Sequence, residues 1–180
     1  MPMAATEKLW TLEELHRLPD DGNKYEVVRG ELFVTPAPTD GHETVLARLT
    51  RILEPYVARH ALGYVYHPRA IFRFDGSEVE PDLMVRAGQP RGGTWDTAPR
   101  PILIVEVLSP TTRRRDSGPK RELYVDAAIP DYWIVDAETR TITVVRPGSD
   151  DVTVADAFVW HPAAASDGLR ITMPEVFGDE

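Results

Sequence analysis

The longest stretch with helical spacing of apolar residues lies between Val45 and Val57. Apolar side chains recur there at intervals of three and four residues, which is the spacing of a helix that packs one face on a sheet. Thr39 or Asp40 is the expected N-cap residue. Pro55 lies inside the pattern and predicts a kink or an early end, because proline has no backbone N–H to donate.

Two pairs of short apolar segments predict β-hairpins. Residues 25–28 and 31–35 flank a tight turn in which Gly30 supplies the positive φ angle that the turn needs. Residues 131–135 and 141–146 flank a polar turn. The other expected strands are 64–66, 69–74, 79–85 and 101–108, followed by two weaker ones at 151–154 and 169–173.

Two shorter helices are expected as well. The sequence of Thr11–Glu14 is a capping box, in which the threonine and the glutamate each accept a backbone hydrogen bond. A later helix is expected to have Asp116 or Ser117 as its cap and Pro119 in its first turn, and to end near residue 128. This order of elements predicts an α/β (α+β) fold, with a central mixed sheet flanked by helices and a hairpin near the N-terminus.

Length and composition limit the possible classes of protein. A chain of 180 residues predicts a single domain with its own core. There is no cysteine, which excludes disulfides, thiol catalysis and cysteine-bound zinc. No secretory signal and no run of about 18 apolar residues is present, so we expect a cytoplasmic protein that does not enter a membrane.

The net charge of −9 argues against a protein that coats nucleic acid, because such a protein needs a basic surface. The charge is compatible with a nuclease, since a carboxylate site is acidic until a metal ion binds and reverses the local sign. Arginine dominates the basic residues, with 17 Arg and 3 Lys. Because lysine is rare in this chain, a lysine close to the two carboxylates is a candidate functional residue. Lys120 is such a lysine, and it lies at an expected helix start.

Two expected strands carry a carboxylate among apolar residues. Glu106 lies within the most apolar strand, and Asp82 follows Pro81 in the preceding one. Proline inside a strand indicates an edge or a distortion. A buried ionised carboxylate costs several kcal/mol unless it is paired or bound to a cation. Glu106 is therefore either paired with Lys120 or an arginine without any catalytic role, or it shares a cation with Asp82.

A hard divalent cation suits the second alternative. Mg²⁺ prefers oxygen ligands and keeps several waters, so two carboxylates and a backbone carbonyl are enough to hold it. The metal would polarise a phosphoryl oxygen and lower the pKa of an attacking water. Lys120 would then hold that water or stabilise the charge that develops on the phosphate.

Several longer motifs carry a resemblance to a known family. Pro81-Asp82 followed by Glu106 after an apolar strand is similar to the PD-(D/E)XK nuclease superfamily. The longer pattern, which covers most of residues 10–146, resembles the Uma-two family of restriction endonucleases. The motifs are YEVVRGEL at 25–32, a helix opening with His42, EPDLMV at 80–85, ILIVEVLSPTT at 102–112, DSGPKRELY at 116–124 and IPDYWIVD at 129–136.

The resemblance implies a restriction-endonuclease-like core at about residues 25–146, with a C-terminal extension over 147–180. It implies cleavage of DNA phosphodiester bonds with Mg²⁺ or Mn²⁺. Asp82 and Glu106 match the metal-binding acids, and the Val107 carbonyl matches the backbone ligand. The usual lysine position holds Leu108, and Lys120 is the position that matches a lysine moved to the following helix.

Other residues are weaker candidates for the same site. Glu31 is either a third acid or a solvated charge at a strand end. His42 is either a proton-relay group close to the acids or an ordinary buried histidine at a helix start. Tyr124 lies one helical turn after Lys120, where it orders the site or simply packs. A basic run either contacts DNA phosphates or is a solvated loop; its members are Arg113, Arg114 and Arg115.

Three functions are compatible with these residues. The first is a metal-dependent DNA endonuclease, expected to be a homodimer because two strands are cleaved symmetrically. The second is an inactive DNA- or protein-binding module on the same fold, which the acidic charge and Leu108 favour. The third is a glycosidase with paired acids, for which the chain offers no clear cleft lined with aromatic side chains.

Overall fold

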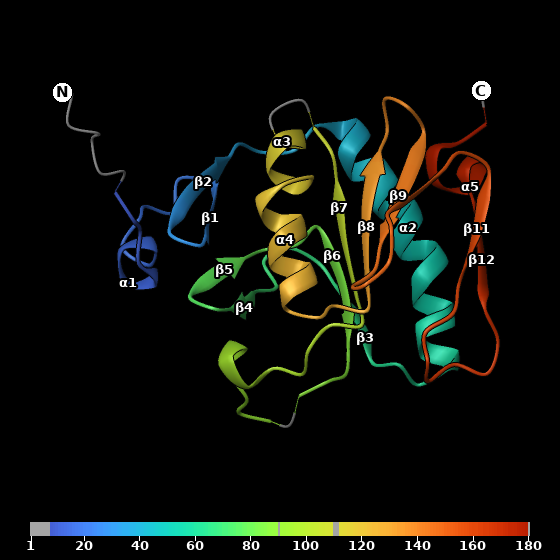
Figure 1. Cartoon of the computed structure of the whole chain (residues 1–180), viewed down its shortest axis with the longest axis horizontal. Coiled ribbons are helices and arrows are strands. Elements are labelled where there is room, and N and C mark those ends of the chain that lie inside the picture. The colour runs from blue at the N-terminus through green and yellow to red at the C-terminus, as the bar shows by residue number, and fades with distance from the viewer. Residues whose placement is uncertain (1–7, 90, 110–111, 180) are drawn as a thin grey trace.

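A six-stranded mixed sheet forms the centre of the protein (Figure 1). The computed structural model describes residues 8–89, 91–109 and 112–179. Strands β7 and β8 are parallel and every other neighbouring pair in this sheet is antiparallel. In spatial order the strands are β10 (Val152–Val154), β9 (Thr141–Val145), β8 (Asp131–Asp136), β7 (Leu103–Val107), β6 (Leu83–Arg86) and β3 (Tyr64–Tyr66).

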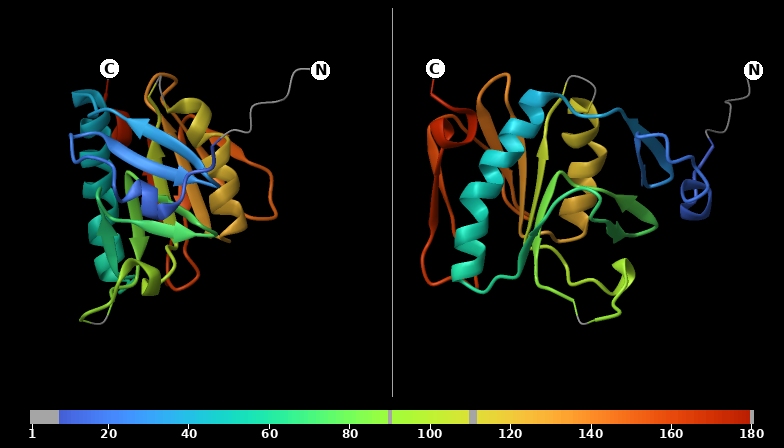
Figure 2. Two further views of the ribbon diagram at one scale, coloured as in Figure 1. Left: turned by 90° about the vertical axis from the view of Figure 1, so that its left-hand side faces the viewer. Right: turned by 180° about the vertical axis from the view of Figure 1, so that it is seen from behind.

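Helices cover both faces of this sheet, α2 (Asp40–Arg59) on one and α4 (Pro119–Asp126) on the other (Figure 2). Because side chains alternate along a strand, Val105 and Val107 of β7 pack in the core on the α2 side. Ile104 packs in the core on the α4 side. All of β7 is buried, as its continuous apolar sequence predicts.

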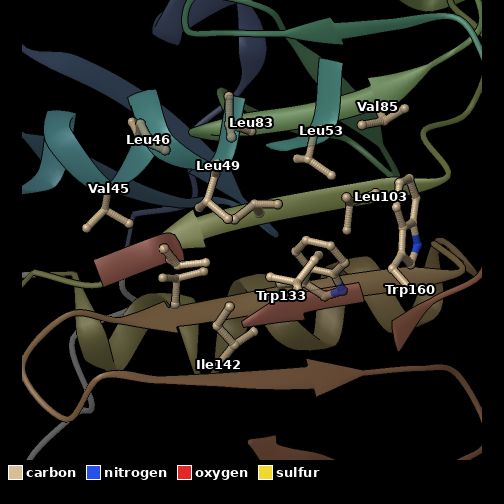
Figure 3. Packing of buried hydrophobic residues seen from close by; sticks show 14 of the residues in the cluster. Val45, Leu46, Leu49, Leu53, Leu83, Val85, Leu103, Trp133, Ile142 and Trp160 are labelled. Carbon is tan, nitrogen blue, oxygen red and sulfur yellow. The ribbon is translucent and has the colours of Figure 1, made fainter. Parts of the chain in front are cut away.

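The core on the α2 side is the larger of the two. Leu49 and Leu53 of α2 have no exposed surface and lie over Leu83 and Leu103 (Figure 3). Trp133 of β8 meets Trp160 edge to face, with ring centroids 5.6 Å apart. The elements that complete this side are the hairpin β11 (Ala157–Trp160) and β12 (Leu169–Thr172) and the helix α5 (Met173–Phe177).

A four-stranded antiparallel sheet joins the core on the α4 side. Its outer hairpin is the expected N-terminal one, and α1 (Leu12–Leu15) precedes it with the expected capping box. In spatial order the strands are β2 (Glu31–Thr35), β1 (Lys24–Val28), β5 (Ser77–Val79) and β4 (Phe72–Phe74). The mixed sheet, the flanking helices and the N-terminal hairpin confirm the predicted fold class.

The expected strand over residues 79–85 is wrong in one respect: it is two strands in two sheets. The chain leaves the four-stranded sheet after Val79 and enters the six-stranded sheet at Leu83. The antiparallel register of Leu83 with Val105 would place Pro81 opposite Val107. Proline cannot donate to the ladder, so pairing stops there and Asp82 lies at the crossing between the sheets.

The helix expected to be capped at Asp116 or Ser117 is also different. It is α4, and its N-cap residue is Gly118, which makes no side-chain hydrogen bond. A separate short helix, α3 (Arg113–Asp116), precedes it where the sequence predicted an irregular connection. Pro55 does not end α2, which continues to Arg59.

Four elements were not expected from the sequence: η1 (Trp95–Thr97), α3, β11 and α5. A signal for α5 was present, because Thr172 and Glu175 form a capping box at its start. In the part of the chain that the structure describes, no helix has the length and apolar character needed to cross a membrane.

Candidate functional site

Strand alternation brings Glu106 and Lys120 together on one face of the large sheet. Glu106 lies two residues after Ile104 on β7, so its side chain points to the α4 side. Lys120 lies in the first turn of α4, whose buried face meets that same surface. Glu106 is 1% exposed and Lys120 is 0% exposed, so both charges are inside the protein and must be compensated there.

Lys120 is held between two carboxylates. Its Nζ lies 2.7 Å from Glu106 Oε1 and 2.7 Å from Glu26 Oε1, and Asp116 Oδ1 is 3.9 Å away. The Tyr124 hydroxyl donates to Glu106 Oε1 at 2.8 Å. The expected proximity of Glu106, Lys120 and Tyr124 is therefore present, as a buried ion-pair and hydrogen-bond network.

Glu26 was not singled out from the sequence. It lies on β1 between Tyr25 and Val27 and has no exposed surface. Its Oε1 also accepts the backbone N–H of Glu80 at 2.9 Å. Its Oε2 is buried without a hydrogen-bond partner among the described residues, although Arg115 Nη1 is at ion-pair distance, 3.4 Å. The sequence did contain a signal for a buried acid at this position, because Glu26 lies between apolar neighbours in a hairpin strand.

Asp82 forms a second, more accessible part of the cluster. Its Oδ2 accepts the backbone N–H of Val107 at 2.9 Å, in the ladder position that the chain leaves open at Pro81. His42 Nε2, from the first turn of α2, lies 3.1 Å from the same oxygen. Lys24 Nζ lies 3.4 Å from Asp82 Oδ1 and donates to the Glu80 carbonyl at 3.0 Å. His42 is thus placed beside Asp82, which is the first of the two alternatives that the sequence left open.

The two acids have opposite pKa shifts. Burial would raise the pKa of Asp82, but the hydrogen bond from His42, the charge of Lys24 and the Val107 N–H together hold it well below its ordinary value. Burial raises the pKa of Glu106 to about 7 despite the charge of Lys120, and the charge of Asp82 adds to the rise. Burial would lower the pKa of Lys120, but Glu106 and Glu26 hold it above its ordinary value.

A pocket of about 470 Å³ opens onto the Asp82 side of the cluster. Asp82, Lys24, His42 and Val107 line it. Glu106 and Lys120 are not among its lining residues, so they lie behind the wall that Asp82 forms. A ligand in this pocket therefore meets Lys24, whose side chain is 17% exposed.

The structure does not bring every candidate residue to the cluster. Glu31 is exposed at the start of β2, and Glu26 on the paired strand is the third acid instead. Arg113 pairs with Asp136 and Glu138.

The other two arginines of the basic run differ from each other. Arg115 is buried and paired with Glu26 and Asp116, and it lines the acidic pocket rather than a solvated loop. Arg114 is exposed. The basic run therefore contains one side chain that faces solvent without an ion pair among the described residues.

The comparisons with known proteins agree with this fold. A family profile described as "Uma2: Putative restriction endonuclease" matches residues 12–174. The chain belongs to the Uma2 family. Its match covers every residue of the cluster, from Lys24 to Tyr124. No curated protein matches the chain.

A solved structure shows the same fold for this Uma2 protein. It is the crystal structure of "a putative nuclease belonging to DUF820" from Anabaena variabilis, which superposes with a TM-score of 0.77. The two sequences are 20% identical, and the match covers 93% of this chain and 97% of the other.

The donor atoms of this Uma2 protein suit a hard cation. No group of three His, Asp or Glu side chains within the described ranges is arranged to hold a metal ion. Mg²⁺ does not need three, because it usually binds through one or two carboxylates and keeps several waters. Asp82 is ionised beside the pocket, and the hydrogen bonds that Glu106 accepts from Lys120 and Tyr124 both end on Oε1. The oxygen chemistry therefore fits such an ion.

Proposed function

We propose that this Uma2 protein is a metal-dependent endonuclease that hydrolyses DNA phosphodiester bonds. The observation that carries the proposal is the contact of Asp82 with the backbone N–H of Val107, the residue next to Glu106. Each of the two acids also has a lysine partner, Lys24 for Asp82 and Lys120 for Glu106. Asp82 borders a pocket that is open to solvent. The family and the fold support a nuclease. The carboxylates and lysines are the groups that phosphoryl transfer to water requires.

Asp82, Glu106 and the Val107 carbonyl would hold Mg²⁺ or Mn²⁺. When bound, the ion polarises a phosphoryl oxygen and lowers the pKa of the attacking water. Asp82 is suited to this because its low pKa keeps it ionised at neutral pH. His42 positions Asp82 by its contact with Oδ2 and leaves Oδ1 toward Lys24.

The two lysines of the cluster have different roles in this proposal. Lys24 lines the pocket and can reach a phosphate, where its charge would stabilise the transition state. Lys120 is enclosed by Glu26 and Glu106. We assign Lys120 as a positioning residue that fixes Glu106, and Lys24 as the cation that meets the substrate.

Nicking of supercoiled plasmid tests the proposal. Wild type should nick DNA with Mg²⁺ or Mn²⁺ and stop when EDTA is added. Asp82→Asn should lower the rate by at least about a hundredfold. Asp150→Asn is the matched control, because Asp150 is exposed, does not line the acidic pocket and makes no ion pair with the described residues. Equal nicking by wild type and Asp82→Asn would refute the assignment of the site.

A second candidate function is an inactive binding module on the same fold. The observation that favours it is the closed contact of Lys120 with Glu106, together with Leu108, which packs against the apolar core where a catalytic lysine is usual. Titration calorimetry with Mn²⁺ separates the two functions. A nuclease site binds Mn²⁺ in wild type and loses it in Asp82→Asn, whereas a module shows no binding in either.

We also propose that the active form is a homodimer. The argument is that two subunits related by twofold symmetry cleave the two antiparallel strands of a duplex equivalently. Sedimentation equilibrium with and without a short duplex measures the mass of the particle. A monomer under both conditions would contradict this proposal and leave the assignment of the site unaffected.

A further inference from the structure

A second pocket lies at the other end of β6 from Asp82. It encloses about 190 Å³, and its walls come from β4, the end of β6 and the segment around η1. None of its lining residues also lines the acidic pocket. Arg86, Trp95 and Arg100 are among those that line it. The proposed nuclease chemistry uses none of these three residues.

Arg86 is an exception among the buried cations. Three lysine or arginine side chains are buried in the described part of the chain: Lys120, Arg115 and Arg86. Lys120 and Arg115 each have carboxylates within 4 Å. Arg86 is 2% exposed, and the described residues place no carboxylate at ion-pair distance from it. Its Nε is buried without a hydrogen-bond partner, and its Nη1 donates to the Ala87 carbonyl at 3.0 Å.

Aromatic rings compensate part of this charge. The guanidinium carbon lies 4.0 Å from the ring centroid of Tyr66 and 5.6 Å from that of Trp95. Such contacts stabilise a cation less than a buried carboxylate partner does. They do not offset the loss of hydration of a buried, unpaired charge. The rings and the single hydrogen bond therefore leave the positive charge of Arg86 only partly compensated, and a bound anion would complete the compensation.

The walls of the pocket have a net positive charge. Arg73 is paired with Glu78 and with Asp96, the acid that lines this pocket. Arg100 is exposed, and the described residues offer it no ion pair. After the pairing of Arg73 and Asp96, two guanidinium groups, those of Arg86 and Arg100, remain uncompensated.

We propose that this pocket binds a phosphate group, with Arg86 as its buried anchor. Two guanidinium groups match the charge of a phosphate, and the planar fork of arginine matches its oxygens. The phosphate has two possible sources, a free nucleotide or the backbone of bound DNA. Arg86 is the last residue of β6 and Asp82 directly precedes its first residue, a separation of about 13 Å along an extended chain, so either source is compatible with a substrate at Asp82.

Titration calorimetry with inorganic phosphate and with thymidine monophosphate tests the proposal. Wild type should bind both with a stoichiometry of one. Arg86→Met keeps a long apolar side chain and removes the charge, and it should weaken binding by at least about tenfold. Arg51→Met is the control, because Arg51 is an exposed arginine on α2; it should bind as wild type does.

The melting temperature is a second measurement, and it separates a loss of phosphate binding from a failure of the variant to fold. Phosphate should raise the melting temperature of wild type and of Arg51→Met by mass action, and it should not raise that of Arg86→Met. Circular dichroism verifies that the variant is folded. Absence of saturable binding by wild type would overturn the proposal, and so would equal binding by wild type and folded Arg86→Met.

The source of the phosphate follows from competition with DNA. If a short duplex displaces thymidine monophosphate, and Arg86→Met weakens duplex binding by a similar factor, the pocket binds the DNA backbone. If the duplex binds without displacing the nucleotide, the pocket binds a free phosphate compound. Both results support a phosphate site, and neither depends on cleavage, so the proposal stands or falls separately from the nuclease assignment.

Discussion

Lys120 has no exposed surface, and its ammonium group lies 2.7 Å from carboxylate oxygens of both Glu26 and Glu106. Removing it leaves two carboxylates buried without their shared cation. Lys120→Met should therefore lower the free energy of unfolding by about 3–5 kcal/mol. Urea denaturation measures the change.

Lys24→Met is the matched control for that variant. Lys24 is partly exposed and borders the pocket, so water can replace its charge and the loss of stability should be smaller. Its effect should instead be on cleavage, because it faces the substrate. Equal destabilisation by the two substitutions, or full nicking activity in Lys24→Met, would contradict the division of roles between the lysines.

The stability should depend on pH through Glu106. Burial raises the pKa of Glu106 from 4.5 to about 7, so the folded state binds this proton more tightly than the unfolded chain does. Its contribution to the free energy of unfolding is full below pH 4.5 and falls as the pH rises to about 7. Glu106→Gln should remove this decline.

Urea titrations of wild type and Glu106→Gln across that pH window measure the difference. Because metal binding requires the ionised carboxylate, nicking by wild type should rise as the pH passes about 7. An identical pH dependence of stability in both proteins would contradict the prediction, because it would mean that ionisation of Glu106 does not lower the free energy of unfolding.

At the scale of elements, the crossing between the two sheets positions Asp82. Val79 ends a strand of one sheet and Leu83 begins a strand of the other. Pro81 stops the ladder between them, and the Asp82 carboxylate takes the free N–H of Val107. The sequence indicated a distortion at Pro81, but the pairing partners of the two strands came from distant segments that no local pattern specifies.

The connection from α2 to β3 depends on Gly63. Gly63 has a φ of +115°, and a Cβ there would lie 2.1 Å from the Arg86 carbonyl oxygen. Gly63→Ala should therefore destabilise the protein by about 3 kcal/mol. Gly41→Ala is the control, because Gly41 lies in the first turn of α2 with no atom within 4 Å of its Cβ position.

Alanine at position 41 should raise stability by about 0.5–1 kcal/mol, since glycine inside a helix loses more backbone entropy on folding. Thermal and urea unfolding of the two variants give the comparison. A Gly63→Ala variant as stable as wild type would mean that this connection moves away from Arg86 without cost.

At the scale of the whole molecule, the charge of −9 opposes binding to DNA. Many arginines of the protein are already paired with acidic side chains, as Arg29 is with Glu122 and Asp126. A cation at the acidic cluster would change the local sign of the potential. Affinity for a duplex should therefore be at least about tenfold higher with Ca²⁺ than with EDTA.

Gel-shift titrations measure this dependence, and Ca²⁺ avoids cleavage during the measurement. Asp82→Asn should lose most of the difference between Ca²⁺ and EDTA. Tight binding in EDTA by wild type would instead locate the DNA on a surface away from the cluster.

The sequence by itself determined the fold class, the two hairpins, the central strand and the choice of Asp82, Glu106 and Lys120 as candidate residues. Each has a local signal: an apolar period, a turn residue, or a charge in an apolar strand. The pairing of Glu106 with Lys120 was one of the alternatives that the sequence left open, and the structure decided for it. Whether the fold is one domain stays a prediction.

Only the tertiary structure decided which other charges join them. Glu26 and Lys24 come from a hairpin in a different sheet, and Asp116 and Arg115 come from a short helix that no period indicates. The tertiary structure also decided which lysine faces the pocket. Burial of a charge and its compensation depend on all the elements that surround it, and that information is spread over the whole chain.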